Sequence, residues 1–286
     1  YINETTQHAD IILPPTSALE HDHYDLAFHR LAVHNTARFN EAVFEPDEGT
    51  RHDWEIFNEL GLAVAARKGM EVKPLPSPDK LIDRGIQRGP YSAAAGHELE
   101  LTLDKIKQHP HGLDIGPLQP SLPERLCTSD GKIRLMADYI VEDLARLGDE
   151  KQETDKDELL LIGRRHIRSN NSWMHNSHRL VKGKPRWQLL MHPDDMAAHQ
   201  LQDQSQVRIR SRVGEVQTQV LASDEVMPGV VSLPHGWGHK RQGVALNIAA
   251  EQGGVSCNDL TDDKLVDRAS GNSALNGVPV KVFGIQ

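Results

Sequence analysis

Short apolar runs separated by polar turns fill residues 157–286, a pattern typical of β-strands. The runs that predict strands are 159–162, 188–191, 206–211, 215–221, 230–233 and 278–283. The segment Arg212-Val213-Gly214-Glu215 predicts a tight hairpin turn, and Pro193 predicts the start of a short helix over 192–199. Six short strands within this part of the chain predict a small closed β-barrel.

The first 70 residues show a different pattern. Residues 9–15, Ala-Asp-Ile-Ile-Leu-Pro-Pro, predict a strand that leaves a sheet at its prolines. Apolar spacing over 54–66 predicts a helix, with Asp53 as its N-cap. We therefore interpret residues 1–70 as the C-terminal end of an α/β domain.

The middle of the chain, residues 71–156, is rich in Pro and Gly and reads as a connector. Apolar positions over 133–147 predict a helix within it. The charged run 149–158 predicts a solvated linker, so we place the main domain boundary there and start the barrel domain at 157.

Size and charge narrow the class of protein. The chain has 286 residues and a formal charge of -9, with 15 Lys and Arg against 13 Asp and Glu in 157–286 and 17 against 28 in 1–156. This acidity argues against nucleic acid as a partner. No apolar run reaches the roughly 18 residues of a membrane span. Only two cysteines occur, which predicts a reducing, cytoplasmic setting. Because the chain begins at Tyr1, we expect a piece of a longer protein.

A polar loop follows the first predicted barrel strand. Residues 163–178 contain three Arg, three Asn, three Ser and a Trp. Such a loop offers many hydrogen-bond donors and positive charge in one place, as a large anionic heteroaromatic ligand requires. The alternative is an ordinary polar surface loop.

Two further segments are candidates for ligand binding. Residues 234–239, Pro-His-Gly-Trp-Gly-His, follow an apolar strand, and their glycines would let the backbone approach a ligand. His235 and His239 are four apart, but the glycines argue against the helix that a metal pair at this spacing needs. Asn258 carries an amide suited to a pterin or purine edge, although it or Asp259 could instead cap a helix. Cys257 as a nucleophile would need a nearby base.

Scattered histidines complete the candidate chemistry. His21, His23, His29 and His34 form a loose patch, and His109 and His111 form another. We interpret most of them as surface or packing residues. The chain has no compact metal-ligand, phosphate-loop or nucleophile-elbow motif. We therefore assign no catalytic residue and no metal ligand.

The order of these segments resembles the C-terminal part of the large subunit of molybdopterin-dependent oxidoreductases of the dimethyl sulfoxide reductase family. The resemblance rests on 5–14, 163–174, 192–195, 207–216, 228–231 and 258–261. It implies that 157–286 form a six-stranded double-psi β-barrel, the molybdopterin dinucleotide-binding domain, after a partial α/β domain over 1–70. The implied cofactor is bis-molybdopterin guanine dinucleotide with molybdenum or tungsten. The implied cofactor-binding residues are Arg164, Arg165, Asn170, Asn171, Ser172, Trp173, His235, Gly236 and Asn258.

The resemblance also implies what lies outside this chain. In that family the protein ligand to the metal, and the cysteines of any iron–sulfur cluster, lie in the N-terminal half. The partners would be that half of the same polypeptide, a small-molecule substrate and an electron-transfer subunit, and the chain alone would be inactive. Residues 110–118 resemble a formate-dehydrogenase-like branch, in which His111 and Asp114 would either reach a substrate funnel or hold the connector.

Two other functions compete with this interpretation. A non-catalytic barrel module that binds a nucleotide or a protein would contain no molybdenum, even as the full-length protein. A metal-dependent hydrolase would bring together His21, His23, His235 and His239.

Overall fold

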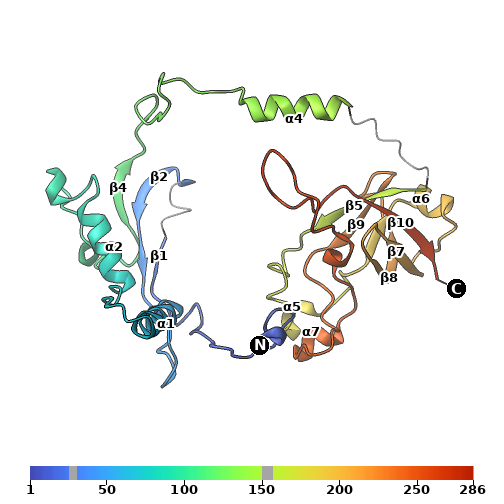
Figure 1. Ribbon diagram of the computed structural model, residues 1–286, viewed down its shortest axis with the longest axis horizontal. Helices are drawn as coiled ribbons and strands as arrows, with labels where there is room; N and C mark the ends of the chain where they lie inside the picture. Colours follow the sequence, from blue (N-terminus) through green and yellow to red (C-terminus); the bar gives the residue numbers. More distant parts are fainter. Residues whose placement is uncertain (26–30, 150–156, 286) are drawn as a thin grey trace. The chain divides into compact units, whose positions relative to one another are not determined.

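The computed structural model describes residues 1–25, 31–149 and 157–285. They divide into two compact units, Tyr1–Asp10 with Arg134–Gln286, and Ile11–Ile133. We describe each unit by itself (Figure 1). His29 and most of the predicted linker, residues 150–156, lie outside the described residues. The domain boundaries predicted at residues 70 and 156 stay predictions.

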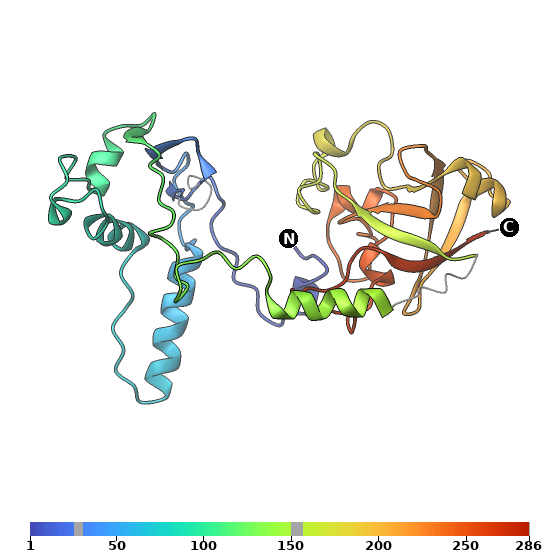
Figure 2. The same ribbon diagram turned by 90° about the horizontal axis from the view of Figure 1, so that it is seen from above.

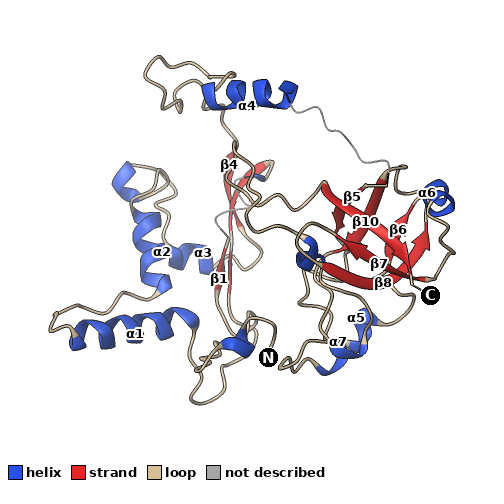
Figure 3. Ribbon diagram, turned by 45° about the vertical axis from the view of Figure 1, so that its right-hand side comes forward, coloured by secondary structure: helices blue, strands red, loops and turns tan. Residues whose placement is uncertain are grey.

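A closed six-stranded barrel dominates the first unit. Its strands close in the order β10-β5-β9-β6-β8-β7, drawn in red in Figure 3. Two neighbouring pairs are parallel, β5 with β9 and β6 with β8, and the others are antiparallel. The strands are β5 (Leu159–Arg164), β6 (Leu189–Met191), β7 (Gln206–Arg210), β8 (Glu215–Ala222), β9 (Val230–Pro234) and β10 (Val278–Gly284). The predicted closed barrel and its six strands are confirmed.

Alternating burial explains why these runs form the barrel. In β7, Val207 and Ile209 are fully buried while Gln206, Arg208 and Arg210 are exposed. The antiparallel partner β8 shows the same alternation, with Val216, Thr218 and Val220 inside. Strand β6 is buried at every position. Each large apolar side chain taken out of water contributes about 1.5–3 kcal/mol, so this interior is the main source of the barrel's stability.

The first unit also contains short helices. Helix α6 (Pro193–Ala198) begins after His192, whose side chain accepts a hydrogen bond from the backbone of Asp194, as predicted for 192–199. The others are η1 (Thr6–His8), α5 (His178–Val181), α7 (Asn247–Glu251) and η4 (Cys257–Leu260). Helix α4 (Asp138–Asp149) begins later than the predicted 133. The Ala137 carbonyl closes its first turn by accepting hydrogen bonds from the backbones of Ile140 and Val141. The negative charge of Asp138 is favourable there, because the N-terminal end of the helix dipole is positive.

The second unit is a small mixed α/β assembly. Strand β1 (His23–Tyr24) pairs with β3 (Phe39–Asn40), and β2 (His34–Ala37) pairs with β4 (Leu113–Pro117). Its helices are α1 (Asp53–Arg67), α2 (Pro78–Gln87), η3 (Ala93–Ala95) and α3 (Leu103–Lys107). A compact apolar core joins strands β2 and β3 to residues 101–106. It consists of Ala37, Phe39, Leu101, Leu103 and Ile106. Part of the predicted connector is therefore folded against Tyr24, Ala37 and Phe39.

Two local predictions in the first 70 residues are wrong. Residues 9–15 form no strand, and no described strand pairs with them. The Asn3 side chain instead accepts hydrogen bonds from the backbones of Thr5 and Thr6, at 3.0 Å each, and starts helix η1. Helix α1 exists as predicted, but its N-cap is His52, not Asp53. Glu55 accepts a hydrogen bond from the His52 backbone at 2.9 Å, which places Asp53 inside the first turn.

Helix α1 leaves much of its apolar side uncovered. Figure 2 shows it as a single long helix beside its returning loop, where the backbone of Leu75 donates to Asn58 Oδ1 at 3.0 Å. Phe57 is 72% exposed and Leu60 is 51% exposed.

Within the described part of the chain, every helix is too short or too polar to cross a membrane.

Candidate functional site

Three loops meet at one end of the barrel. The loop 165–177 follows β5, and the loop 235–246 follows β9. Because β5 and β9 are parallel neighbours, with Arg164 opposite Pro234, their carboxyl ends lie at the same edge. The backbone of His235 donates to the Arg164 carbonyl at 2.9 Å and joins the two loops where they begin. The third segment, 252–261, ends in helix η4.

Two glycines let these loops touch backbone to backbone. Gly236 has φ +85°, and a Cβ there would lie 2.2 Å from the Asn171 carbonyl oxygen. Gly238 has φ +100°, and a Cβ there would lie 2.5 Å from the Ser256 nitrogen. Asn171 itself has φ 61°, in the left-handed region that Asn tolerates better than most residues. The loop contacts therefore require glycine at 236 and 238.

Two pockets lie among the loops. The first, here called the loop pocket, measures about 310 Å³. The second, here called the arginine pocket, measures about 200 Å³ and shares only His235 with the first. The loop pocket is lined by Glu4, Ser172, His235, Gly236, Trp237, Gly238, His239, Arg241, Ser256, Cys257, Asn258 and Asp259. The arginine pocket is lined by Arg165, His166, Ser169, Asn170, Asn171 and His235.

Most of the predicted cofactor-binding residues come together here. Seven of the nine line one or both pockets, namely Arg165, Asn170, Asn171, Ser172, His235, Gly236 and Asn258. Trp173 lines neither pocket, and its side chain is 81% exposed. The alternative role of Asn258 or Asp259 as a helix cap is not adopted, because η4 begins after Ser256.

Arg164 also lies outside both pockets. Its guanidinium donates to the Ser232 carbonyl at 3.0 Å and to the Gln188 carbonyl at 2.9 Å. Burial lowers the pKa of Arg164, since the charged form loses water there. Arg164 thus ties β5 to its neighbour β9 and to the chain entering β6. Arg165, which contacts Asn171 Oδ1, is the arginine that faces a pocket.

A buried row of polar side chains runs beneath the loops, and sequence reasoning did not find it. Ser169 Oγ lies 2.9 Å from His175 Nε2, and His175 Nδ1 lies 3.0 Å from His239 Nε2. His239 Nδ1 lies 3.0 Å from Glu4 Oε1. We call Ser169, His175, His239 and Glu4 the relay. The sequence offered only a weak signal, a histidine in each of two Gly- or Asn-rich loops, because Glu4 and His239 are 235 positions apart.

Burial sets the protonation of the groups around the pockets. It lowers the pKa of His175 to about 4, with the neighbouring His239 acting in the same direction. Burial also lowers the pKa of His235, helped by Arg165. It raises the pKa of the Cys257 thiol, which favours the protonated form. Cys257 therefore lacks the activation that a nucleophilic cysteine needs.

Two of the histidines predicted to be surface or packing residues, His21 and His34, make contacts with neighbouring side chains. His21 Nε2 lies 2.6 Å from Thr16 Oγ1, which in turn lies 2.7 Å from His52 Nδ1. His34 Nδ1 pairs with Asp114 Oδ1 at 3.0 Å across β2 and β4. No group of three His, Cys, Asp or Glu side chains in the described ranges could hold a metal ion. The hydrolase alternative thus gains no support from these residues.

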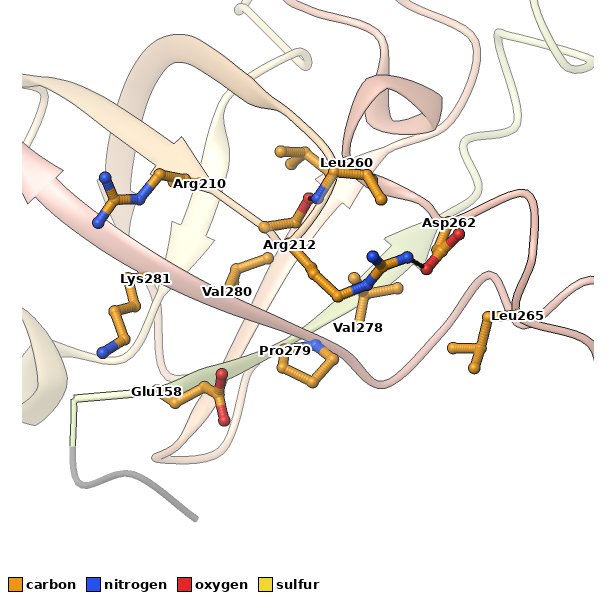
Figure 4. A pocket seen from close by; sticks show the side chains of 12 residues that line it. Glu158, Arg210, Arg212, Leu260, Asp262, Leu265, Val278, Pro279, Val280 and Lys281 are labelled. Carbon is orange, nitrogen blue, oxygen red and sulfur yellow. Dashed lines mark hydrogen bonds and ion pairs between the residues drawn. The ribbon is translucent and has the colours of Figure 1, made fainter. Parts of the chain in front are cut away.

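A third pocket, of about 510 Å³, lies on another part of the barrel and contains none of the predicted residues. Figure 4 shows its apolar floor, with Val278, Val280 and Leu260, and its charged rim. Arg212 contacts Asp262 across the opening. This pocket lacks the convergent amides and histidines of the loop site.

Comparisons with known proteins agree with the barrel and its loops. Residues 159–279 match the family model described as "Molydopterin dinucleotide binding domain". The chain is 25% identical over 282 residues to "Probable oxidoreductase YoaE" of Bacillus subtilis, covering 97% of this chain and 38% of that protein. It is 28% identical over 121 residues to a tetrathionate reductase subunit of Salmonella typhimurium, covering 36% of this chain and 12% of that protein.

A solved structure shows the same fold. Acetylene hydratase from Pelobacter acetylenicus matches 96% of this chain and 38% of its own, with a TM-score of 0.65 and 16% identity. The barrel therefore matches a molybdopterin dinucleotide-binding domain over residues 159–279. The chain as a whole is related to molybdopterin oxidoreductases, and it spans 38% of the length of the relative that it matches over nearly its whole length.

Proposed function

We propose that this chain is the cofactor-binding C-terminal portion of a bis-molybdopterin guanine dinucleotide oxidoreductase with molybdenum or tungsten. The observation that carries the proposal is the convergence of seven predicted residues on two adjoining pockets of a molybdopterin dinucleotide-binding domain. Gly236 and Gly238 allow the loops that carry these residues to make backbone contacts with one another.

The residues fit such a cofactor chemically. Among the described residues, none that lines the arginine pocket is a carboxylate, so Arg165 meets no acidic competitor there. Asn170, Asn171 and Asn258 supply amide donors and acceptors for a polar heteroaromatic edge. Trp237 lines the loop pocket, and its buried Nε1 has no hydrogen-bond partner within the described part of the chain. An unpaired buried donor is costly, and a ligand acceptor would relieve that cost.

The tasks of these residues are binding and orientation. When bound, the cofactor supplies two-electron redox chemistry. Arg165, Asn170 and Asn171 would hold polar atoms of the pterin or its phosphates, while Ser172, His235 and Asn258 would bind from the loop pocket. Gly236 would keep the two pockets adjacent. Because the resemblance places the protein ligand to the metal in an N-terminal half outside this chain, the chain alone would be inactive.

The rest of the enzyme would come from additional polypeptide. The chain spans 38% of the length of the related Bacillus subtilis protein. The exposed Phe57 and Leu60 of α1 form an apolar side that further polypeptide could cover. We propose that this polypeptide, an N-terminal half, supplies the metal ligand and any iron–sulfur cluster, and that an electron-transfer subunit completes the pathway.

The substrate is a small molecule, and formate is one candidate. That proposal rests on the resemblance of residues 110–118 to a formate-dehydrogenase-like branch. In this segment Asp114 pairs with His34 across β2 and β4, which supports the connector role rather than the substrate role. His111 remains on the lining of a wide pocket with His34, Thr36 and Arg38.

Metal and pterin content of the full-length protein tests the proposed function. The protein would be purified from a molybdenum-replete host, and its metal would be measured by elemental mass spectrometry and its pterin by fluorescence after oxidation. We expect about one molybdenum or tungsten and two pterins per chain. A well-folded sample with neither would instead favour a non-catalytic barrel module.

Matched variants locate the site. Arg165→Met and Asn258→Ala are expected to lower the bound pterin severalfold, because each removes a pocket-lining donor. Arg168→Met removes an exposed arginine of the same loop that lines neither pocket, so its pterin content should match the wild type. Equal loss in Arg165→Met and Arg168→Met would point to a general charge effect instead of this site.

A further inference from the structure

The relay connects the two pockets. Glu4 and His239 line the loop pocket, whereas Ser169, at the other end, lines the arginine pocket. Three of its four members are almost fully buried, with His175 1%, His239 5% and Ser169 4% exposed. The ring of His175 also stacks on Trp237, with centroids 3.9 Å apart. The relay is therefore a fixed internal chain of hydrogen bonds with an end in each pocket.

The direction of these hydrogen bonds follows from one end. An ionised carboxylate only accepts, so His239 Nδ1 donates to Glu4. When the His239 ring carries this one proton only, its Nε2 accepts, which requires His175 Nδ1 to donate. The lowered pKa of His175 keeps that ring neutral at pH 7, so its Nε2 accepts from the Ser169 hydroxyl. All three protons point toward Glu4, and Ser169 keeps only its lone pairs for another partner.

We propose that the relay makes Ser169 a hydrogen-bond acceptor in the arginine pocket, and that the pocket takes a ligand edge with adjacent C=O and N–H groups. Arg165, which has only donors, would bind the C=O group, and Ser169 would bind the N–H group. The oxo-pyrimidine edge of a pterin or a guanine has this pattern. This assignment of ligand class rests on the proposed function, whereas the direction of the relay does not.

A phosphate suits this pocket less well. Phosphate oxygens only accept, so they would face the lone pairs of Ser169 unless the relay reversed. Reversal needs an extra proton on His239, the ring paired with Glu4. The other titratable or charged groups near the relay are His166 and His235 beside His175, and Arg241, Asp259 and Cys257 in the loop pocket.

Nitrogen-15 NMR of the full-length protein, labelled at histidine, reads the direction directly. Magic-angle spinning spectra at pH 7 would distinguish protonated from bare ring nitrogens, and His175→Gln and His239→Gln difference spectra would assign the two rings. We expect both rings to carry their proton on Nδ1. Free histidine side chains favour Nε2–H, so this result would not arise by default.

Glu4 variants test whether the relay acts as a unit. Glu4→Ala removes the terminal acceptor and should shift both rings to Nε2–H, while Glu4→Gln keeps an acceptor oxygen and should leave both on Nδ1–H. Nε2–H at either ring in the wild type would overturn the proposal, as would a Glu4→Ala variant that leaves His175 unchanged. If Glu4→Ala does not fold, the wild-type and Glu4→Gln spectra still decide.

Ligand binding tests the role of Ser169. We expect 6-carboxypterin to bind the cofactor-free full-length protein about tenfold more weakly after Ser169→Ala, while pyrophosphate binding is unchanged. No binding of 6-carboxypterin to the wild type, or an equal loss for both probes, would overturn the ligand assignment. Absence of pterin and metal from the purified enzyme would sink the proposed function but leave the NMR result on the relay standing.

Discussion

Replacing Gly236 by alanine is the sharpest test of how the loops are assembled. Gly236 has φ +85°, a conformation that costs an L-residue about 1–2 kcal/mol. The new Cβ would also lie 2.2 Å from the Asn171 oxygen and 2.7 Å from the Asn171 carbonyl carbon. Both are backbone atoms and cannot rotate away, so the loop must move, at a further cost of about 1–3 kcal/mol.

Gly229→Ala is the matched control. Gly229 has φ +82° at the other end of β9, but a Cβ there meets nothing within 4 Å. It should show only the conformational cost of about 1–2 kcal/mol. Urea unfolding of both variants, with pterin content measured in parallel, separates strain from the clash. We expect Gly236→Ala to be the less stable variant and to lose pterin, while Gly229→Ala retains it. Equal stability and equal pterin content would refute the proposed contact between Gly236 and the Asn171 loop.

Three further outcomes follow from the site. Because folding depresses the pKa of His175 to about 4, the unfolded chain takes up a proton that the folded protein resists. The contribution of His175 to the free energy of unfolding is therefore complete above about pH 6.5 and falls by up to about 3 kcal/mol toward pH 4. His175→Gln should reduce this pH dependence, which would be measured as the difference between urea midpoints at pH 7 and pH 5. Arg164→Met should lower the free energy of unfolding by about 2 kcal/mol, because it leaves the Ser232 and Gln188 carbonyls without their donor. Arg165→Met should change the free energy of unfolding little. A larger loss for Arg165→Met than for Arg164→Met would contradict the assignment of the two arginines. Iodoacetamide at pH 8 should label the exposed Cys127 about tenfold faster than Cys257, whose thiol is partly buried and has a raised pKa, and similar rates by mass spectrometry would argue against that burial.

Local patterns were sufficient for the barrel strands. Alternation in 206–211 and 215–221, and the short apolar runs elsewhere, predicted all six within one or two residues. The reason is that a strand with one face in a core repeats every two residues, whatever its partners are. The same reasoning failed at 9–15, where a β-rich run has no partner strand among the described residues.

The candidate loops were also visible in the sequence. The family resemblance, which rests partly on these loops, implied nine cofactor-binding residues, and seven of them line the two pockets. Residue type alone marks a loop as polar and gives its hydrogen-bonding capacity. It does not say which side chains face inward, and Trp173 stands exposed outside both pockets.

Only the tertiary structure decided how those groups are used. Arg164 and Arg165 are adjacent in sequence, yet the strand ends at this point and its pleat sends one guanidinium to backbone carbonyls and leaves the other at a pocket. The parallel pairing of β5 with β9 brings the loops together, because parallel strands end at the same edge. Glu4 reaches His239 from 235 positions away, and no local pattern encodes a contact made by the folding of the whole chain.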